Sequence, residues 1–312
     1  MLAGEEHPAR KLVEFGVSAE EAGLAFLFLS DHFHPWNLQQ GHSSYTWSVL
    51  GALATRTERV GLFSAVTCPI LRIHPTNLAQ AASTVYHLSD GRFCLGLGTG
   101  EALNEKVVGK GFPPFAERLA RLEEALMRTR ELLTGTEVSS QGEFFSLQRA
   151  QLFDAATDLK IYLASSGERS ARLAGRLADG LICLGSRPEL LSAFQEAGGT
   201  GPAVAQLSVC WAASREEAAR TAHRFFPEVC LEGTLFAELS TPADFSRATE
   251  DVKLQDVAAS IVCGPDPQPY LELIRECLEA GYRAVALHQI GPDQDGFLNF
   301  WRSQLLPRLN NA

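Results

Sequence analysis

Short runs of continuously apolar residues alternate along this chain with longer segments in which apolar residues recur every three or four positions. The first pattern predicts strands that are buried on both faces, and the second predicts helices that pack on one face. The expected strands are 25–30, 60–66, 92–98, 160–164, 180–184, 205–212, 260–263 and 283–288. The expected helices are 8–23, 47–54, 76–87, 113–133, 168–178, 188–197, 215–226, 269–280 and 297–309. Strands and helices therefore alternate through almost the whole sequence.

Seven or eight strand-then-helix units in 312 residues predict the α/β class and a single (β/α)8 TIM barrel domain over residues 1–312. Three segments depart from the repeat. Residues 136–146 alternate about a Gln-Gly pair, which is typical of a surface hairpin. Residues 228–257 are acidic and less regular, and we interpret them as an inserted helical lid or dimer element. The first barrel strand should precede the helix at 8–23, yet only residues 1–4 are available. That strand is therefore short or missing, or the natural start lies further upstream.

The composition is that of an ordinary globular protein, with 46% hydrophobic and 21% charged residues. A formal net charge of −10 argues against nucleic acid as a partner, because binding a phosphate backbone requires a basic surface. The seven cysteines lack CxxC spacing, which favours buried thiols in a reducing cytosol over a disulfide or zinc framework. No apolar run reaches the about 18 residues of a membrane helix, so we expect a soluble, cytoplasmic protein without a membrane partner.

The densest group of chemically reactive side chains follows the first expected strand. Residues 30–36 place Asp31, His32, His34 and Trp36 at the carboxyl end of a strand, where parallel sheets hold their ligand sites. Imidazole and carboxylate are metal ligands, but no His-x3-His pair supports a metal site. His32 is then either a hydrogen-bonded structural residue or a catalytic one. We favour catalysis, because imidazole titrates near neutral pH and a neighbouring carboxylate can raise its basicity.

Two further strand ends carry candidate binding residues. Gly98 and Gly100 belong to a GxGxG motif, whose spacing differs from the dinucleotide fingerprint, although such glycines let backbone amides approach a phosphate or a flat ring. Glu101 is either an acid whose pKa is raised by burial or an ordinary glutamate at a helix N-terminus. Ser166 and Gly167 follow another strand and either cap the next helix or offer amide donors to an anion.

Taken together, residues 30–36 and 96–105 resemble the luciferase-like monooxygenase superfamily, and more closely its deazaflavin branch, which includes F420-dependent glucose-6-phosphate dehydrogenase. Smaller matches at 174–180 and 305–309 keep the same register. The resemblance implies a TIM barrel that binds coenzyme F420 at the carboxyl ends of its strands and exchanges hydride at ring carbon C5. It also implies a homodimer. Because the superfamily has flavin branches on the same barrel, FMN is the alternative cofactor.

The resemblance also implies roles for individual residues. Asp31 would contact the deazaflavin, and His32 would act as a general base or stabilise charge on the substrate. Trp36 would stack near the reacting centre, and Glu101 would donate a proton to the cofactor or the substrate. A non-prolyl cis peptide bond would join Ala65 to Val66 beneath the ring. The tail of the cofactor would be held by Gly98, Thr99, Gly100, Asn104, Ser166 and Gly167.

The sugar-phosphate site of that branch does not carry over to this sequence. The dehydrogenase of the branch binds the phosphate with two lysines and an arginine, whereas the matching positions here hold Arg187, Ala258 and either Asp295 or Gly296. Loss of these charge-assisted bonds argues against glucose 6-phosphate as the substrate. The sequence therefore predicts an F420-dependent oxidoreductase of a small alcohol, aldehyde or enone-like compound. An FMN-dependent luciferase-like oxidoreductase or monooxygenase is the alternative, and a non-catalytic barrel that binds a flavin is a third hypothesis.

Overall fold

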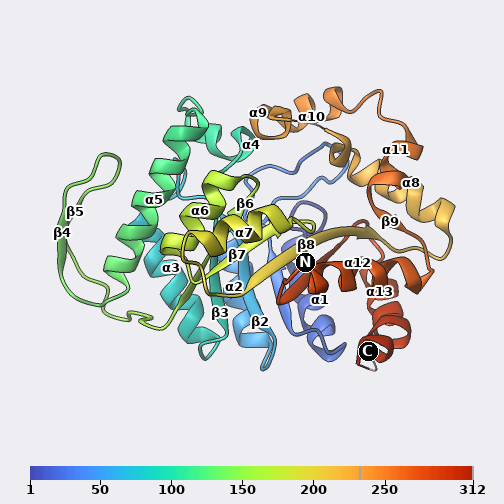
Figure 1. Cartoon of the computed structure of the whole chain (residues 1–312), viewed down its shortest axis with the longest axis horizontal. Helices are drawn as coiled ribbons and strands as arrows, with labels where there is room; N and C mark the ends of the chain where they lie inside the picture. The colour runs from blue at the N-terminus through green and yellow to red at the C-terminus, as the bar shows by residue number, and fades with distance from the viewer. Residues whose placement is uncertain (232, 311–312) are drawn as a thin grey trace.

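A curled sheet of parallel strands lies at the centre of the computed structural model, which describes residues 1–231 and 233–310 (Figure 1). Within these residues, seven strands follow one another in the order β1-β2-β3-β6-β7-β8-β10, and all their pairings are parallel. The strands are β1 (Phe26–Leu29), β2 (Gly61–Thr67), β3 (Phe93–Leu97), β6 (Lys160–Ser165), β7 (Gly180–Leu184), β8 (Ala203–Cys210) and β10 (Ala284–Gln289). A two-residue strand, β9 (Val262–Cys263), pairs with the carboxyl end of β8. The predicted α/β fold, with parallel strands curled as in a TIM barrel, is confirmed.

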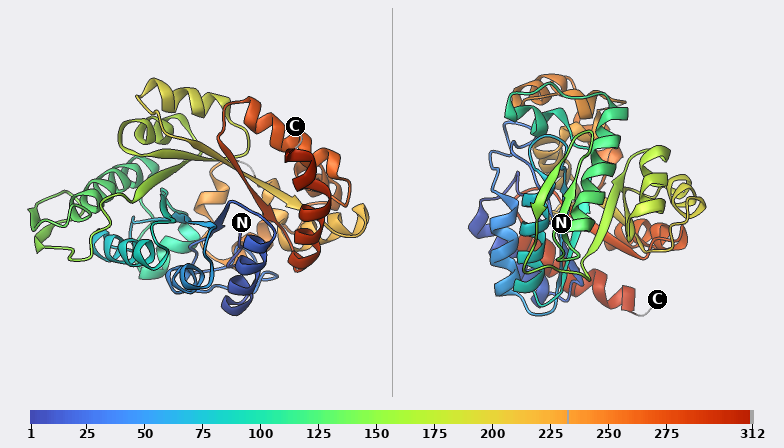
Figure 2. Two further views of the ribbon diagram at one scale, coloured as in Figure 1. Left: turned by 90° about the horizontal axis from the view of Figure 1, so that it is seen from below. Right: turned by 90° about the vertical axis from the view of Figure 1, so that its left-hand side faces the viewer.

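Helices surround the outer face of this sheet (Figure 2). Proline begins α3, where the side chain of His74 also accepts a hydrogen bond from the backbone N–H of Thr76. The outer helices are α1 (Ala9–Glu21), α2 (Thr46–Arg56), α3 (Pro75–Leu88), α5 (Phe115–Leu132), α6 (Glu168–Leu177), α7 (Pro188–Glu196), α8 (Arg215–Phe225), α12 (Pro267–Glu279), α13 (Gln294–Phe300) and α14 (Leu306–Asn310). The predicted hairpin consists of β4 (Val138–Ser140) and β5 (Leu147–Ala150), which pair antiparallel. No described helix is long and apolar enough to cross a membrane.

The core has two layers because the strands are apolar on both faces. The side chains that fill the inside of the barrel come from successive strands and are Phe28, Phe63, Tyr162, Ile182, Val204 and Ala286. Alternate residues on the same strands, such as Leu27 and Leu62, pack outward against helix residues such as Leu53 and Leu122. This packing fixes the direction of each strand, and with it the place where each strand ends.

The N-terminal residues lie between the two ends of the sheet, β1 and β10. The backbone N–H of Leu2 donates to the carbonyl of Phe28, and Leu2 forms a parallel bridge with Leu29. On the other side, the amine of Met1 donates to the carbonyl of Leu287. The expected short first strand is therefore reduced to a single bridge, which places residues 4–7 at the carboxyl ends of the neighbouring strands.

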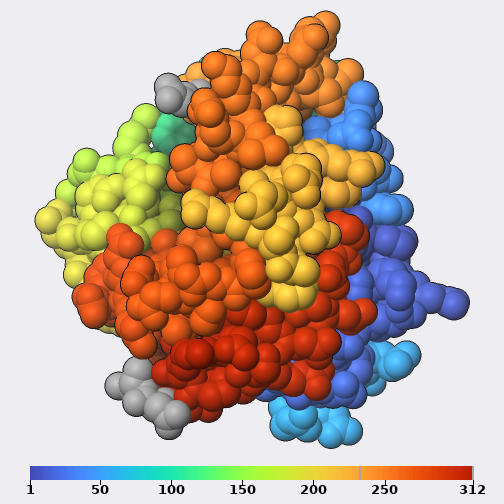
Figure 3. Space-filling model, turned by 90° about the vertical axis from the view of Figure 1, so that its right-hand side faces the viewer, coloured from blue at the N-terminus to red at the C-terminus, as the bar shows by residue number. Residues whose placement is uncertain are grey.

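The segment expected as a helical insertion is helical. It contains a 3-10 turn (Pro227–Cys230), α9 (Leu235–Glu238), α10 (Pro242–Ala248) and α11 (Leu254–Ser260), and its residue 232 lies outside the described residues. These residues, coloured orange, form the top of the right-hand face of the molecule (Figure 3). The strand expected at 260–263 is shorter than predicted. Ser260 ends α11, where its hydroxyl donates to the carbonyl of Asp256.

Candidate active site

The candidate residues gather at one end of the barrel because parallel strands all finish on the same side. Asp31 and His32 follow β1, Thr67 ends β2, and Gly98 to Glu101 follow β3. Ser166 and Gly167 follow β6 on the same side of the sheet. Residues 98–101 and 166–167 therefore lie on the same side of the barrel as His32.

His32 pairs with a carboxylate that the sequence analysis did not single out. Its Nδ1 atom lies 2.6 Å from Oε1 of Glu5, and the two side chains are only 13% and 3% exposed. The other oxygen of Glu5 accepts hydrogen bonds from the hydroxyl of Ser30, at 2.8 Å. Burial disfavours the charged imidazole, but the Glu5 carboxylate outweighs it and raises the pKa of His32. Burial likewise opposes ionisation of Glu5, but the contact with His32 prevails and lowers the pKa of Glu5.

Asp31 does not serve as the partner of His32, although it is adjacent in the chain. One oxygen of Asp31 accepts a hydrogen bond from Thr67 Oγ1 at 2.6 Å, and the other accepts from Arg72 Nη2 at 2.9 Å. The same Arg72 nitrogen donates to the backbone carbonyl of Asp31. Asp31 therefore joins the ends of β1 and β2 and leaves Arg72 engaged with a carboxylate.

Asn104 fixes the loop that carries the histidines. Its Oδ1 accepts hydrogen bonds from the backbone N–H groups of Phe33 and His34, at 2.9 and 3.2 Å. The ring of His34 is turned away from His32, since its Nδ1 lies 3.0 Å from the carbonyl oxygen of Leu103. The Nδ2 of Asn104 is buried and has no hydrogen-bond partner. A buried donor without a partner is expensive unless a ligand satisfies it.

The peptide bond between Ala65 and Val66 is cis, as the resemblance implied. Gly98 packs against the side chain of Val66: a Cβ atom at position 98 would lie 2.7 Å from Val66 Cγ2. Gly100 adopts a φ of +70°, and a Cβ atom there would lie 2.9 Å from the side chain of Glu105. Both glycines are thus required by the close approach of neighbouring side chains to the backbone at the end of β3.

Trp36 and Glu101 are the other two candidate residues near His32. Glu101 is the half-buried residue that precedes α4 (Ala102–Glu105), and its charge is one of those that raise the pKa of His32. The indole of Trp36 meets the ring of His32 edge-on, with 4.7 Å between ring centroids. An acid, a base and an aromatic wall are therefore brought together.

The serine pair after β6 does not cap α6 through a side chain. Gly167 is the N-cap residue and makes no side-chain cap, while the hydroxyl of Ser165 is buried without a partner. No atom lies within 4 Å of a Cβ built on Gly167, so space is open at this helix end. Gly167 therefore stands at the capping position, as one of the two interpretations expected, but no side chain caps the helix.

Sequence reasoning assigned no role to four buried carboxylates: Glu5, Glu6, Glu105 and Glu228. Glu6 Oε1 lies 3.4 Å from Nε2 of His288 on β10, and Glu228 accepts hydrogen bonds from Nδ2 of Asn37. Burial raises the pKa of Glu228 to about 8. Glu5 and Glu6 could have been identified from the sequence, because they directly follow the expected short first strand, just as Asp31 follows the next strand. Nothing in the local pattern around Glu228 distinguishes it from the exposed acids of its segment.

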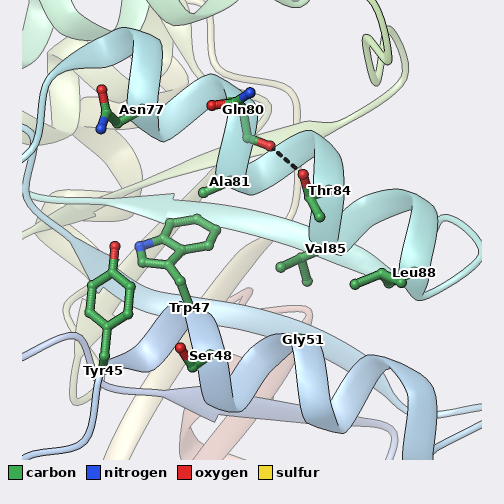
Figure 4. A pocket seen from close by; sticks show the side chains of 10 residues that line it. All are labelled: Tyr45, Trp47, Ser48, Gly51, Asn77, Gln80, Ala81, Thr84, Val85 and Leu88. Carbon is green, nitrogen blue, oxygen red and sulfur yellow. Dashed lines mark hydrogen bonds between the residues drawn. The ribbon is translucent and has the colours of Figure 1, made fainter.

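A separate groove of about 420 Å³ lies on the outside of the barrel, between α2 and α3 (Figure 4). Tyr45, Trp47 and Ser48 line one side, and Gln80, Thr84 and Leu88 belong to the other. The groove holds no acid–base pair, so it is not a second candidate active site.

The fold is that of a TIM barrel, and the cluster at the carboxyl ends of its strands is its candidate active site. The chain belongs to the luciferase-like monooxygenase family, because the model of that family matches residues 1–284.

Named relatives refine this placement. The chain is 34% identical to the F420-dependent glucose-6-phosphate dehydrogenase of Nakamurella multipartita, in a match that covers 98% of this chain and 94% of that protein. It is 35% identical to the enzyme of the same name from Rhodococcus hoagii, with 98% and 96% covered. The solved structure of an F420-dependent secondary alcohol dehydrogenase in complex with an F420-acetone adduct superposes with a TM-score of 0.89 at 24% identity, and the match covers 98% of this chain and 96% of that one. At this level of identity, the similarity shows a shared fold.

Proposed function

We propose that this protein is an F420-dependent oxidoreductase that exchanges hydride between the deazaflavin and a small organic substrate. The observation that carries the proposal is the buried His32–Glu5 pair at the carboxyl end of a luciferase-like barrel. The relatives named as F420-dependent dehydrogenases support the choice of cofactor. FMN on the same barrel is the alternative.

The residues present fit a flat ring with a polar tail. Gly98 gives the ring a backbone surface without a side chain, next to the cis bond between Ala65 and Val66. Gly98, Thr99 and Gly100 would hold the cofactor through this segment. Asn104 Nδ2 and Ser165 Oγ are buried polar atoms that lack partners, and no atom lies within 4 Å of a Cβ built on Gly167. F420, when bound, supplies the carbon that takes up or gives hydride.

His32 is the proposed general base for alcohol oxidation. Its Nδ1 is engaged by Glu5, so Nε2 is the nitrogen available to take the hydroxyl proton of the substrate. Glu5 keeps the ring in one orientation and stabilises the imidazolium that results. In the direction of carbonyl reduction, the same Nε2 returns the proton to the substrate oxygen.

Glu101 is the proposed second proton-transfer residue, and Trp36 shapes the space beside His32. Asp31 acts by holding the loop that carries His32, because both of its oxygens are bound by Thr67 and Arg72. In this proposal His32 and Glu101 transfer protons, whereas Asp31 only positions His32.

Glucose 6-phosphate is an unsuitable substrate for this site. Arg187 is directed to Glu189, with 2.5 Å between Nε and Oε1, and its side chain is 43% exposed. Ala258 and Gly296 cannot carry charge, and Asp295 would repel a phosphate dianion. A small substrate without a phosphate fits these residues better.

We further propose a cytoplasmic homodimer of single-domain chains. The groove between α2 and α3 supports the dimer, because the large side chains of Tyr45 and Leu88 are 60% and 45% exposed beside small residues such as Gly51 and Ala81. The free cysteines support a reducing compartment.

Side-by-side titration of the purified protein with F420 and FMN tests the proposed cofactor, with quenching of each cofactor's fluorescence as the readout. We expect selective binding of F420. His32→Gln should retain this binding within a few-fold and lose about 10²–10⁴-fold in turnover. Binding of FMN alone would replace the proposal with flavin chemistry, and full turnover of His32→Gln would remove His32 from the mechanism.

A further inference from the structure

Three aromatic rings from distant parts of the chain meet beside His32. The ring centroid of Phe236, on α9, lies 4.4 Å from that of Trp36. Phe245, on α10, is fully buried and lies 5.4 Å from Trp36 and 5.8 Å from Phe236. Trp36 in turn meets the edge of His32. The insertion therefore supplies the rings that back the indole next to the proposed base.

The position of α9 extends this wall across the site. Helix α9 packs against α4, the short helix that follows Glu101, and the two lie next to each other at the top of the molecule (Figure 1). Because Phe236 also contacts Trp36, α9 touches both the indole next to His32 and the helix α4 that follows Glu101. A substrate held between His32 and Glu101 would therefore lie next to α9.

The loop that carries Trp36 is fixed both to the insertion and to the end of α8. Asn37 Nδ2 donates to Glu228 and to the carbonyl of Phe225, which also accepts from Gln40 Nε2. The backbone N–H of Leu38 donates to the hydroxyl of Ser246. These bonds hold the indole and the insertion together, so the aromatic wall has a defined place.

The charges around the wall disfavour an anionic substrate. The cation nearest to Asp31, Arg72, is paired with it, and the positive charge of Arg118 lies in the field of Glu101 and Glu238. Glu238 belongs to α9 itself. Arg118 makes no ion pair with a described acid: it donates to the carbonyl of Pro113 and its guanidinium stacks on the ring of Phe112. Two acids and one cation leave this side of the site with a net negative charge, which disfavours a phosphate or carboxylate on the substrate.

We propose that Phe236 is a specificity-determining residue, and that α9 restricts the substrate to an uncharged alcohol or ketone with compact apolar substituents. This inference rests on the proposed function of the site. The carbinol carbon lies near His32, and the apolar substituents pack on the wall of Trp36 and Phe236. A bulky substituent is excluded because the ring of Phe236 occupies the space it needs.

The test is the rate of F420 reduction by the full-length protein with propan-2-ol, pentan-2-ol, 1-phenylethanol and glucose 6-phosphate. Phe236→Ala should shift the ratio of kcat/KM for 1-phenylethanol over propan-2-ol by at least about tenfold toward the larger alcohol, since pocket volume is worth that much discrimination. Phe236→Leu, which keeps an apolar side chain, should shift the ratio in the same direction by less. Leu235→Ala on the same helix is the matched control, because Leu235 is 42% exposed, and it should leave the ratio unchanged.

The outcomes separate this inference from the proposed function. Failure of F420 to bind the wild-type protein would overturn the proposed function. Normal F420 binding with faster turnover of glucose 6-phosphate than of any uncharged alcohol would overturn the substrate class alone. An unchanged ratio in both Phe236 variants, with F420 binding retained, would show that the ring does not set specificity.

Discussion

Nδ1 of His32 and Oε1 of Glu5 lie 2.6 Å apart. His32 follows β1, and Glu5 follows the N-terminal residues that pair with β1. The carboxylate comes just after the single bridge that remains of the first strand, and the imidazole comes from the loop after β1. Because both groups are buried, their attraction is poorly screened by water. This pair gives the site a base of raised pKa that neither segment would have alone.

The first prediction concerns the pH dependence of turnover. Glu5→Gln removes the charge that raises the pKa of His32, so that pKa should fall. Since alcohol oxidation requires neutral His32, activity rises as pH increases through this pKa, and the acid limb of the kcat/KM profile should move to lower pH. Glu6→Gln is the control, because Glu6 contacts His288 instead. An acid limb that stays in place in Glu5→Gln would refute the coupling.

The second prediction concerns stability and Glu228. Burial raises the pKa of Glu228 from 4.5 to about 8, so between these values the folded protein holds a proton that the unfolded chain has released. Stability should therefore fall as pH rises from about 4.5 to about 8. Glu228→Gln should flatten this decline, which is worth about 1.4 kcal/mol for each pKa unit at most.

Thermal unfolding of Glu228→Gln at pH 5 and pH 8 measures the effect. The variant should match the wild type at pH 5 and have the higher Tm at pH 8. Glu250→Gln, at an exposed position in the same segment, should follow the wild-type curve. Parallel curves for all three proteins would mean that Glu228 ionises normally.

The third prediction concerns the glycine at the end of β3. Gly98→Ala places a Cβ atom 2.7 Å from Val66 Cγ2, which should cost about 1–3 kcal/mol of unfolding free energy and weaken F420 binding by on the order of tenfold. Gly111→Ala is the matched control, because no atom lies within 4 Å of its Cβ position. Denaturant titration and F420 fluorescence give the two readouts. Wild-type affinity in Gly98→Ala would place the cofactor elsewhere.

The fourth prediction concerns the groove between α2 and α3. Thr84→Arg puts a long charged side chain into this groove and should convert the proposed dimer to monomer, as measured by light scattering after gel filtration. Thr55→Arg, an exposed position on α2 that does not line the groove, should remain dimeric. A wild-type protein that is monomeric at micromolar concentration would refute the dimer itself.

The sequence by itself determined the class of fold and the segments that carry the site. Apolar strands buried on both faces have a recognisable pattern, and parallel strands all end on one side, so residues such as His32 and Gly98 were assigned to a common end of the barrel. The cis bond between Ala65 and Val66 followed from the resemblance and is present in the structure.

The tertiary structure alone decided which groups act on each other. Asp31 is adjacent to His32 in the chain but binds Thr67 and Arg72, whereas Glu5 supplies the carboxylate. The same holds for Phe236, which reaches Trp36 from an irregular acidic segment. The physical reason is that a side chain's pKa and contacts depend on burial and on neighbours brought in by strand pairing and helix packing. Local sequence patterns record the period of each element but not the partner that its side chains meet.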